Sequence, residues 1–332
     1  MKTAFICNET NNLHYVFSNQ IIDSLKEHGF DSNCYKKEDV LKNKSAFVDT
    51  EYVFSTWGMP EFTEQEIKEY LPALKCVFYA AGSVQSFARP FLNCSVKVFS
   101  AWAANAVPVA EYALAQIILA GKGFFRCSSI SDKNSYYQAR DTFSGYTGNY
   151  NARVGILGAG MIGKLVIKML KSYKLDVMVF DPFLSDEKAA QLGVEKSSLE
   201  DIFSRCNVIS NHLANNEQTK GMLVGAFFER MMPNSTFINT GRGAQVVEPE
   251  LCAVLKNRPD IVAVLDVTYP EPPEDGHEFY SLKNCILTPH MAGSSGNEVH
   301  RMAEYMLNEY MRFIGGEPTE YEVTAEMLTT MA

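Results

Sequence analysis

Three absences limit what this chain of 332 residues can be. It has no clustered run of lysine and arginine and its net charge is −9, so we expect no nucleic-acid partner and no anionic membrane surface. Its eight cysteines include no CxxC pair and no histidine at metal-ligand spacing, so we predict reduced thiols and no metal site. No uninterrupted apolar stretch approaches membrane-spanning length and no signal-peptide core follows Met1, which favours a cytoplasmic protein.

The amount of apolar sequence indicates two domains, because 332 residues with 46% apolar side chains exceed one ordinary core. In the first hundred residues, short β-rich runs alternate with stretches long enough for helices, which is typical of a parallel α/β layer. These predicted strands lie at 4–7, 52–55, 76–80 and 96–99. A capping box of Thr63 and Glu66 predicts a helix that ends near Pro72.

A second α/β pattern begins with a long apolar helix. We predict this helix over 105–119, mostly buried, with Pro108 in its first turn. A polar segment follows over 128–151, and strands then alternate with helical stretches as in a doubly wound parallel sheet. The predicted strands are 153–157, 177–180, 208–210, 236–239, 262–265 and 286–288.

The last predicted helix, 298–314, has apolar residues at helical spacing and follows the final strand of the second domain, so we expect it to pack on the first. The predicted fold class is therefore α/β, with two Rossmann-like or flavodoxin-like domains, doubly wound parallel sheets and an active-site cleft between the domains. Residues 1–104 plus 296–332 would form a substrate-binding domain, and 105–295 an NAD-binding Rossmann domain.

A glycine-rich loop separates the first strand of the second domain from a helix. In this GxGxxG, Gly158 permits a tight turn, Gly160 lets the backbone approach a pyrophosphate, and Gly163 allows close helix packing. The next strand ends at Asp181, whose carboxylate is placed for adenosine ribose hydroxyls, with no Lys or Arg beside it for a 2′-phosphate. The pattern favours NAD over NADP. A plain glycine-rich turn and a turn aspartate before Pro182 are the alternatives.

Arg242, Glu271 and His290 each follow a predicted strand, and carboxyl ends of strands line the ligand crevice of an open α/β sheet. Hydride removal from a secondary alcohol needs a base for the hydroxyl proton and a group that holds the carboxylate. His290 is the candidate base, Glu271 would stabilise its imidazolium form, and Arg242 would bind the carboxylate and polarise the carbonyl. The alternatives are a loop histidine and a solvated glutamate without catalytic roles.

Together with the glycine loop, these segments resemble the D-isomer-specific 2-hydroxyacid dehydrogenase family, whose four motifs occur here in order and at the same spacing, most strongly over 105–295. The resemblance implies catalytic roles for Arg242, Glu271 and His290, and places Asp266 near the nicotinamide carboxamide. It gives His212 a supporting role near the cofactor, although Ala214 stands where the family usually has proline. The predicted cofactor-binding residues are Gly158, Gly160, Met161, Ile162, Gly163, Asp181, His212, Thr240, Arg242, Asp266 and His290, and the predicted substrate-binding residues are Ala81, Gly82, Ser83, Arg242 and His290.

The resemblance implies an NAD-dependent oxidoreductase that interconverts a small D-2-hydroxy acid and its 2-oxo acid, as a homodimer paired through the helix at 109–119. A dehydrogenase for glycerate or phosphoglycerate stays open, although no extra basic cluster supports phosphate binding. An NAD-sensing interaction protein, like the C-terminal binding corepressors of this family, also stays open. The stretch after Gly82 lacks the aspartate that the family usually has, so the sequence does not name the substrate.

Overall fold

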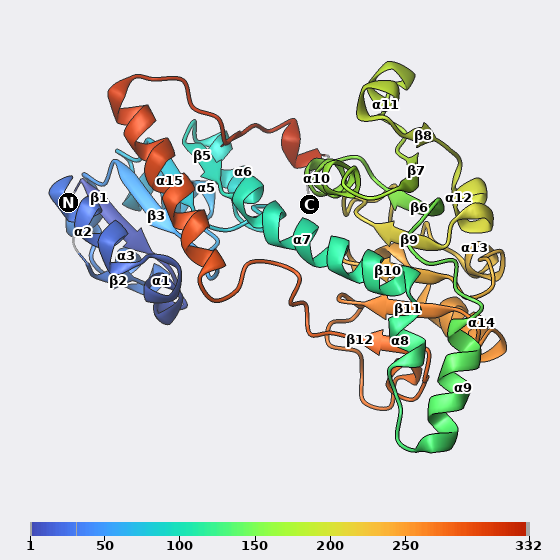
Figure 1. The fold of residues 1–332 in the computed structure, drawn as a ribbon. Helices are drawn as coiled ribbons and strands as arrows, with labels where there is room; N and C mark the ends of the chain where they lie inside the picture. Colours follow the sequence, from blue (N-terminus) through green and yellow to red (C-terminus); the bar gives the residue numbers. More distant parts are fainter. Residues whose placement is uncertain (1, 31, 330–332) are drawn as a thin grey trace. The chain divides into compact units, whose positions relative to one another are not determined.

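The computed structural model describes residues 2–30 and 32–329 and divides the chain into two units. Unit 1 contains the chain up to Ala106 and again from Ser294 onward, and unit 2 is Val107–Gly293 (Figure 1). Each unit has its own sheet and its own apolar core. The prediction of two α/β domains built on doubly wound parallel sheets is confirmed.

The sheet of unit 1 has the strand order β13-β5-β4-β3-β1-β2. All pairs are parallel except the short edge strand β13, which is antiparallel to β5. The strands are β1 (Thr3–Ile6), β2 (Cys34–Tyr35), β3 (Tyr52–Ser55), β4 (Cys76–Tyr79), β5 (Lys97–Ser100) and β13 (Glu322–Val323). The order 2-1-3-4-5 of the parallel strands is that of a flavodoxin-like sheet.

Helices occupy the stretches between these strands, which the sequence shows are long enough for them. The capping box of Thr63 and Glu66 starts α5 as expected. The last helix, α15, packs on unit 1 as predicted, with Val299, Met302 and Met306 fully buried in its core (Figure 1). The helices are α1 (Thr10–Val16), α2 (Asn19–Glu27), α3 (Lys37–Lys42), α4 (Lys44–Phe47), α5 (Glu64–Tyr70), α6 (Ala88–Asn93) and α15 (Glu298–Gly315), with a 3₁₀ turn at Met327–Thr329.

The sheet of unit 2 is fully parallel, in the order β12-β11-β10-β9-β6-β7-β8. The strand order reverses between β6 and β9, which is the point where doubly wound sheets bind ligands. The strands are β6 (Ala152–Leu157), β7 (Leu175–Phe180), β8 (Glu195–Lys196), β9 (Val208–Asn211), β10 (Thr236–Asn239), β11 (Val262–Leu265) and β12 (Cys285–Leu287).

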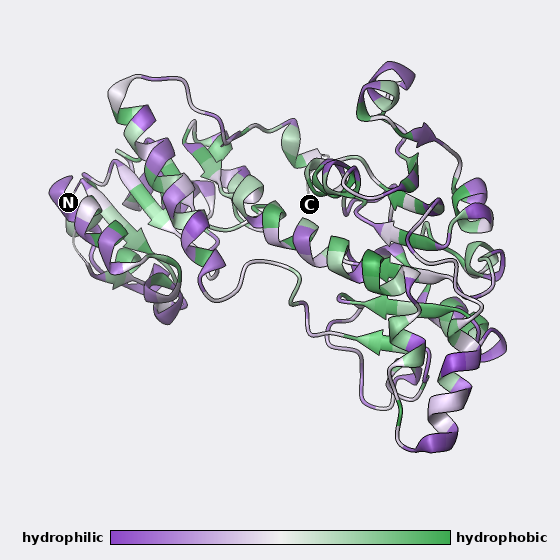
Figure 2. Ribbon diagram, in the orientation of Figure 1, coloured by the Kyte–Doolittle hydropathy of each residue, from purple (hydrophilic) through white to green (hydrophobic). Residues whose placement is uncertain are grey.

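Both faces of this sheet are buried, each against its own apolar core, as is usual for a parallel sheet. Successive side chains of a strand point to opposite faces and so enter different cores. Phe237 belongs to one core, and its neighbour Ile238 belongs to the other. The central strands β10 and β11 are accordingly buried along their whole length, and β11 is apolar throughout (Figure 2). Besides α7 (Trp102–Gly121), the helices of unit 2 are α8 (Phe124–Cys127), α9 (Lys133–Phe143), α10 (Met161–Leu170), α11 (Asp186–Leu192), α12 (Leu199–Arg205), α13 (Gly225–Glu229) and α14 (Glu248–Asn257), with 3₁₀ turns at Gly243–Gln245 and Glu278–Tyr280.

The long helix α7 differs from its prediction. It spans Trp102–Gly121, so Pro108 lies in the helix interior and not in the first turn. The helix starts early because alanines, which are strong helix formers, precede Asn105. By length and composition alone it is apolar enough to cross a membrane, although polar residues such as Glu111 and Gln116 interrupt its apolar sequence. It is also less buried than predicted, with 44% of its most apolar part buried, including Ala113 and Ile117 in the core of unit 2.

Another difference concerns the polar segment 128–151, which contains the helix α9. The Asp132 carboxylate accepts a hydrogen bond from the Ser135 backbone N–H and caps the helix. No residue of α9 is buried, so the helix has no apolar stripe that could reveal it in the sequence (Figure 2). The eight cysteines are free, as predicted.

Candidate active site

The glycine loop follows β6 and leads into α10. Gly158 has φ +91°, and a Cβ there would lie 2.8 Å from the His212 carbonyl oxygen. A Cβ on Gly163 would collide with the Gly158 carbonyl oxygen. Both positions therefore require glycine. Gly160 has no atom within 4 Å of where a Cβ would stand, so its backbone faces open space.

The start of α10 has the features of an anion site. Gly160 is its N-cap and provides no side chain that accepts from the first turn. Met161 is 47% exposed, and Ile162 packs against the core of unit 2. Unpaired backbone N–H groups and the helix dipole favour a phosphate at such an end. The loop thus fits a dinucleotide pyrophosphate, and Gly158, Gly160, Met161, Ile162 and Gly163 are the residues that would hold it.

Asp181 lies at the end of β7, beside this loop. Its carboxylate accepts hydrogen bonds from the backbone N–H groups of Ala159, at 2.7 Å, and Phe183, at 2.8 Å. The sequence did not indicate this contribution to loop structure. Because each carboxylate oxygen has two lone pairs, Asp181 can still accept from ribose hydroxyls.

His212 is buried where the chain leaves β9. Its Nε2 lies 2.9 Å from the Ser210 hydroxyl and its Nδ1 lies 3.3 Å from the Thr240 hydroxyl. Burial lowers the pKa of His212 to about 4, so the ring is neutral near pH 7. A neutral ring between two hydroxyls suits a supporting role and not that of a proton donor.

A buried amide network shapes the turn that carries Arg242. Asn211 and Asn239 are register neighbours at the ends of β9 and β10, and their side chains are hydrogen-bonded at 2.9 Å. The Gln245 side chain accepts from Asn211 at 2.6 Å and from the Arg242 backbone N–H at 3.2 Å. The Asn239 side chain donates to the Arg242 carbonyl. Sequence analysis missed this network, although two asparagines at adjacent strand ends were its signal.

The Arg242 guanidinium keeps most of its donors available. It donates once, to the Gly241 carbonyl at 2.8 Å, and no carboxylate of the described residues lies within ion-pair distance. Burial lowers the pKa of Arg242, and the charge of Glu271 opposes that shift. Arg242 and Glu271 line a hollow of about 340 Å³. The other residues that line it are Asn215, Gly243, Ala244, Thr268, Tyr269 and Pro270.

Glu271 and His290 form a hydrogen-bonded pair, although they follow different strands. The His290 Nδ1 lies 2.7 Å from a Glu271 carboxylate oxygen, and the two side chains are 47% and 40% exposed. With Nδ1 engaged by a carboxylate, Nε2 is the nitrogen that takes up or releases a proton. The structure thus brings together two of the three predicted catalytic residues directly, and places Arg242 on a hollow shared with Glu271.

Asp266, buried at the end of β11, shapes the loop that carries His290. Its carboxylate accepts from the Thr288 hydroxyl at 2.6 Å and from the backbone N–H groups of Met291 and Ala292, both at 2.9 Å. Its carbonyl accepts from the His290 N–H at 3.0 Å. His290 has φ +52°, a conformation that a side-chain-bearing residue keeps only when its surroundings hold it. Asp266 is therefore a support for His290, a contribution that the sequence did not indicate.

The predicted substrate loop, Ala81, Gly82 and Ser83, follows β4 in unit 1. The Ser100 hydroxyl lies 2.9 Å from the Ala81 carbonyl and 2.6 Å from the Gly82 carbonyl. Ser83 is exposed. These three residues belong to a different unit from the cluster around Arg242 and His290.

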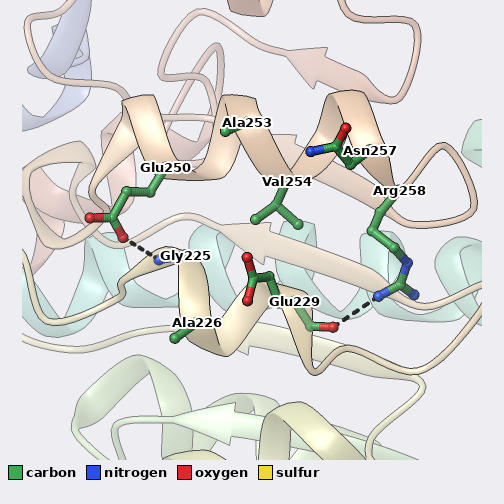
Figure 3. A pocket seen from close by; sticks show the side chains of 8 residues that line it. All are labelled: Gly225, Ala226, Glu229, Glu250, Ala253, Val254, Asn257 and Arg258. Carbon is green, nitrogen blue, oxygen red and sulfur yellow. Dashed lines mark hydrogen bonds between the residues drawn. The ribbon is translucent and has the colours of Figure 1, made fainter.

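A second hollow of unit 2, about 310 Å³, lies between α13 and α14 and contains none of the predicted site residues (Figure 3). Two of its side chains bind backbone groups of other lining residues. The Glu250 carboxylate accepts from the Gly225 N–H, and the Arg258 guanidinium donates to the Glu229 carbonyl (Figure 3). The predicted chemistry therefore maps to the first hollow. Among the described residues, no three His, Cys, Asp or Glu side chains are grouped to hold a metal ion.

Known proteins are similar in sequence to this chain. The YoaD protein of Bacillus subtilis, which carries a provisional name as a 2-hydroxyacid dehydrogenase, is 33% identical over 235 residues, 68% of this chain and 65% of that protein. D-3-phosphoglycerate dehydrogenase of Mycobacterium bovis is 29% identical over 222 residues, 67% of this chain. The chain spans 65% and 41% of the lengths of these two relatives.

Solved structures share the fold. D-mandelate dehydrogenase of Rhodotorula graminis superposes with a TM-score of 0.80 at 18% identity, covering 97% of each chain. A phosphoglycerate oxidoreductase of Rhizobium etli gives a TM-score of 0.77 at 21% identity, covering 99% of this chain and all of that one. Residues 114–292 match the model of the D-isomer specific 2-hydroxyacid dehydrogenase NAD-binding domain, which confirms the resemblance and the cofactor predicted from the sequence. The chain belongs to the D-isomer specific 2-hydroxyacid dehydrogenase family.

Proposed function

We propose that this protein is an NAD-dependent dehydrogenase that interconverts a small D-2-hydroxy acid and its 2-oxo acid. One observation carries the proposal: the 2.7 Å bond between His290 and Glu271, near a hollow that Arg242 lines without a carboxylate partner. A proton carrier and a free cation are what a 2-oxo acid needs, because its carboxylate is anionic and its carbonyl oxygen gains a proton on reduction.

Each residue has a defined part in this reaction. When bound, NAD(H) supplies or accepts the hydride at carbon 2 of the acid. His290 gives its proton to the carbonyl oxygen during reduction and takes the hydroxyl proton during oxidation. Glu271 stabilises the imidazolium form of His290. Arg242 binds the carboxylate and favours negative charge on the carbonyl oxygen.

The proposed cofactor site runs from the glycine loop to Asp181. The loop and the start of α10 would hold the pyrophosphate, and the Asp181 carboxylate would accept from ribose hydroxyls. A 2′-phosphate would meet the negative charge of Asp181, which favours NAD over NADP. His212, Thr240 and Asp266 would line or support the nicotinamide end. Ala81, Gly82 and Ser83 of unit 1 are proposed as backbone donors to the substrate.

A phosphorylated acid is the second candidate, because several relatives are named D-3-phosphoglycerate dehydrogenase. The hollow lined by Arg242 and Glu271 favours the unphosphorylated substrate, since Arg242 is the one cation among its described lining residues. A phosphate would need further positive charge. An NAD-sensing interaction protein is the third candidate, and it would bind NADH without turnover.

We also propose a homodimer. Exposed apolar side chains occur at the end of α7, on α8 and α9 and in the loops beside them, and neither α8 nor α9 has a buried residue. They are Leu119, Phe124, Ile130, Tyr136, Tyr137, Phe143 and Tyr150. Such a set supports burial against a second copy of the chain. Sedimentation should give twice the mass of one chain, and a monomer at micromolar concentration would refute this pairing.

The proposed activity is tested by following NADH oxidation with a panel of 2-oxo acids: pyruvate, longer aliphatic and aromatic acids, hydroxypyruvate and its phosphate. We expect turnover with an unphosphorylated acid. Turnover with the phosphate alone would establish the second candidate. NADH binding without turnover of any member would overturn the dehydrogenase proposal.

A further inference from the structure

We propose that Glu248 is a positioning residue, whose carboxylate holds both ends of the segment that carries Glu271 and so orients the Glu271–His290 pair. This inference rests on the proposed function, because it assigns Glu248 to the same reaction. Glu248 is the first residue of α14 and is buried at 6% exposure. Glu248 is not among the site residues that the sequence predicts.

The contacts of Glu248 bracket Glu271. One carboxylate oxygen accepts from the Tyr269 backbone N–H at 2.8 Å, two residues before Glu271. The other lies 3.7 Å from the His277 Nε2, six residues after it. Segment 269–277 is otherwise largely exposed, so a buried carboxylate that is hydrogen-bonded to one of its ends and faces the other electrostatically restricts how Glu271 moves.

A second contact of His277 fixes which ring nitrogen carries the proton when the ring is neutral. Its Nδ1 accepts a hydrogen bond from the Phe279 backbone N–H at 3.3 Å, so in the neutral ring the proton is on Nε2. That N–H faces the Glu248 carboxylate. Ionised Glu248 therefore accepts a hydrogen bond from the Tyr269 N–H at one oxygen, and its other oxygen faces the His277 N–H at 3.7 Å, an electrostatic contact longer than a hydrogen bond.

Protonation of Glu248 would upset this arrangement. A carboxylic acid that still accepts from Tyr269 would direct its O–H toward the His277 N–H, so two donors would meet. Glu248→Gln creates the same conflict, because its amide NH₂ replaces the second oxygen. Burial raises the pKa of Glu248 to about 7, although the Tyr269 bond opposes this. The other titratable groups near its charge are the thiols of Cys252 and Cys285, whose pKa values burial raises to about 11 and about 12.

The consequence is a loss of activity at low pH in the reduction direction. Reduction consumes the proton of His290, so acid by itself favours the catalytic form of that residue. We therefore expect any fall in kcat as the pH drops through about 7 to come from a group other than His290, and we assign it to the protonation of Glu248. The segment loosens when Glu248 takes up a proton.

The test compares wild type, E248Q and E250Q in two measurements. Glu250 is the matched control, because it lies on the same helix and its carboxylate also accepts a backbone N–H, that of Gly225, on the other hollow (Figure 3). In steady-state reduction from pH 5.5 to 9, wild type and E250Q should lose kcat below about pH 7. E248Q should have a kcat about tenfold lower at pH 8, no such loss toward pH 6, and little change in KM.

Hydrogen exchange supplies a readout that does not need turnover. At pH 8, amides of residues 268–280 should exchange at least fivefold faster in E248Q than in wild type or E250Q. An unchanged exchange rate in E248Q, or an acid limb identical to that of wild type, would overturn the positioning role. If wild type reduces none of the 2-oxo acids, the proposed function fails, and the exchange comparison alone decides whether Glu248 holds the segment.

Discussion

Asp266→Asn removes the carboxylate that holds the His290 loop. In the wild type this side chain accepts three hydrogen bonds, from the Thr288 hydroxyl and from the Met291 and Ala292 backbone N–H groups. Asparagine has one side-chain oxygen, so at least one of these donors meets its NH₂ group. A buried donor without a partner costs about 1–3 kcal/mol, and the remaining bonds lose their charge, for about 1 kcal/mol more.

The total of roughly 2–4 kcal/mol should lower the melting temperature by roughly 4–16 °C for a unit of this size. A loosened His290 should also lower kcat by about 10²-fold, the usual cost of a small misplacement of a reacting group. Melting followed by circular dichroism and steady-state reduction measure both. Asp186→Asn is the control, because that side chain is 92% exposed. D266N with the melting temperature and kcat of wild type would refute the support that we assign to Asp266.

The remaining predictions concern single side chains of the site. His290→Gln should lower kcat by about 10²–10⁴-fold and leave NADH affinity unchanged, and wild-type kcat would contradict its role as proton carrier. Arg242→Gln should raise KM and lower kcat together; a change in neither refutes carboxylate binding. Asp181→Asn should narrow the preference for NADH over NADPH by about 1–3 kcal/mol in a fluorescence titration, and an unchanged preference would refute repulsion between Asp181 and the 2′-phosphate. Burial raises the pKa of Glu248 from its usual 4.5 to about 7, so between these pH values the folded protein holds a proton on Glu248 that the unfolded protein has released. Because burial causes this shift, wild type should lose global stability relative to E248Q as the pH rises from 4.5 to about 7, by at most about 3 kcal/mol, while segment 269–277 itself becomes better held, and parallel melting curves would exclude the loss.

The sequence predicted the parts of this protein that depend on local pattern. The alternation of strands and helices set the fold class, because apolar runs bounded by turn residues are local signals. The glycine loop was recognisable because packing requires glycine at Gly158 and Gly163. Glu271 and His290 could be paired in advance because each follows a parallel strand, and those strand ends share one edge of the sheet.

What escaped prediction depends on three-dimensional surroundings. Glu248 lies in an acidic first turn of a helix and resembles an ordinary surface residue until the 269–277 segment covers it. Asp266 has a side chain whose partners lie some twenty residues later in the chain. The helix α9 has no buried face, so no periodicity marks it.

The most direct test of the central proposal is the kinetic comparison of wild type with His290→Gln, using NADH and the 2-oxo acid that wild type reduces best. NADH binding is measured in parallel by fluorescence. We expect equal NADH affinity, product of the D configuration, and a kcat at least about 10²-fold lower in the variant. Equal kcat in the two proteins, or no reduction of any 2-oxo acid by wild type that binds NADH, would contradict it.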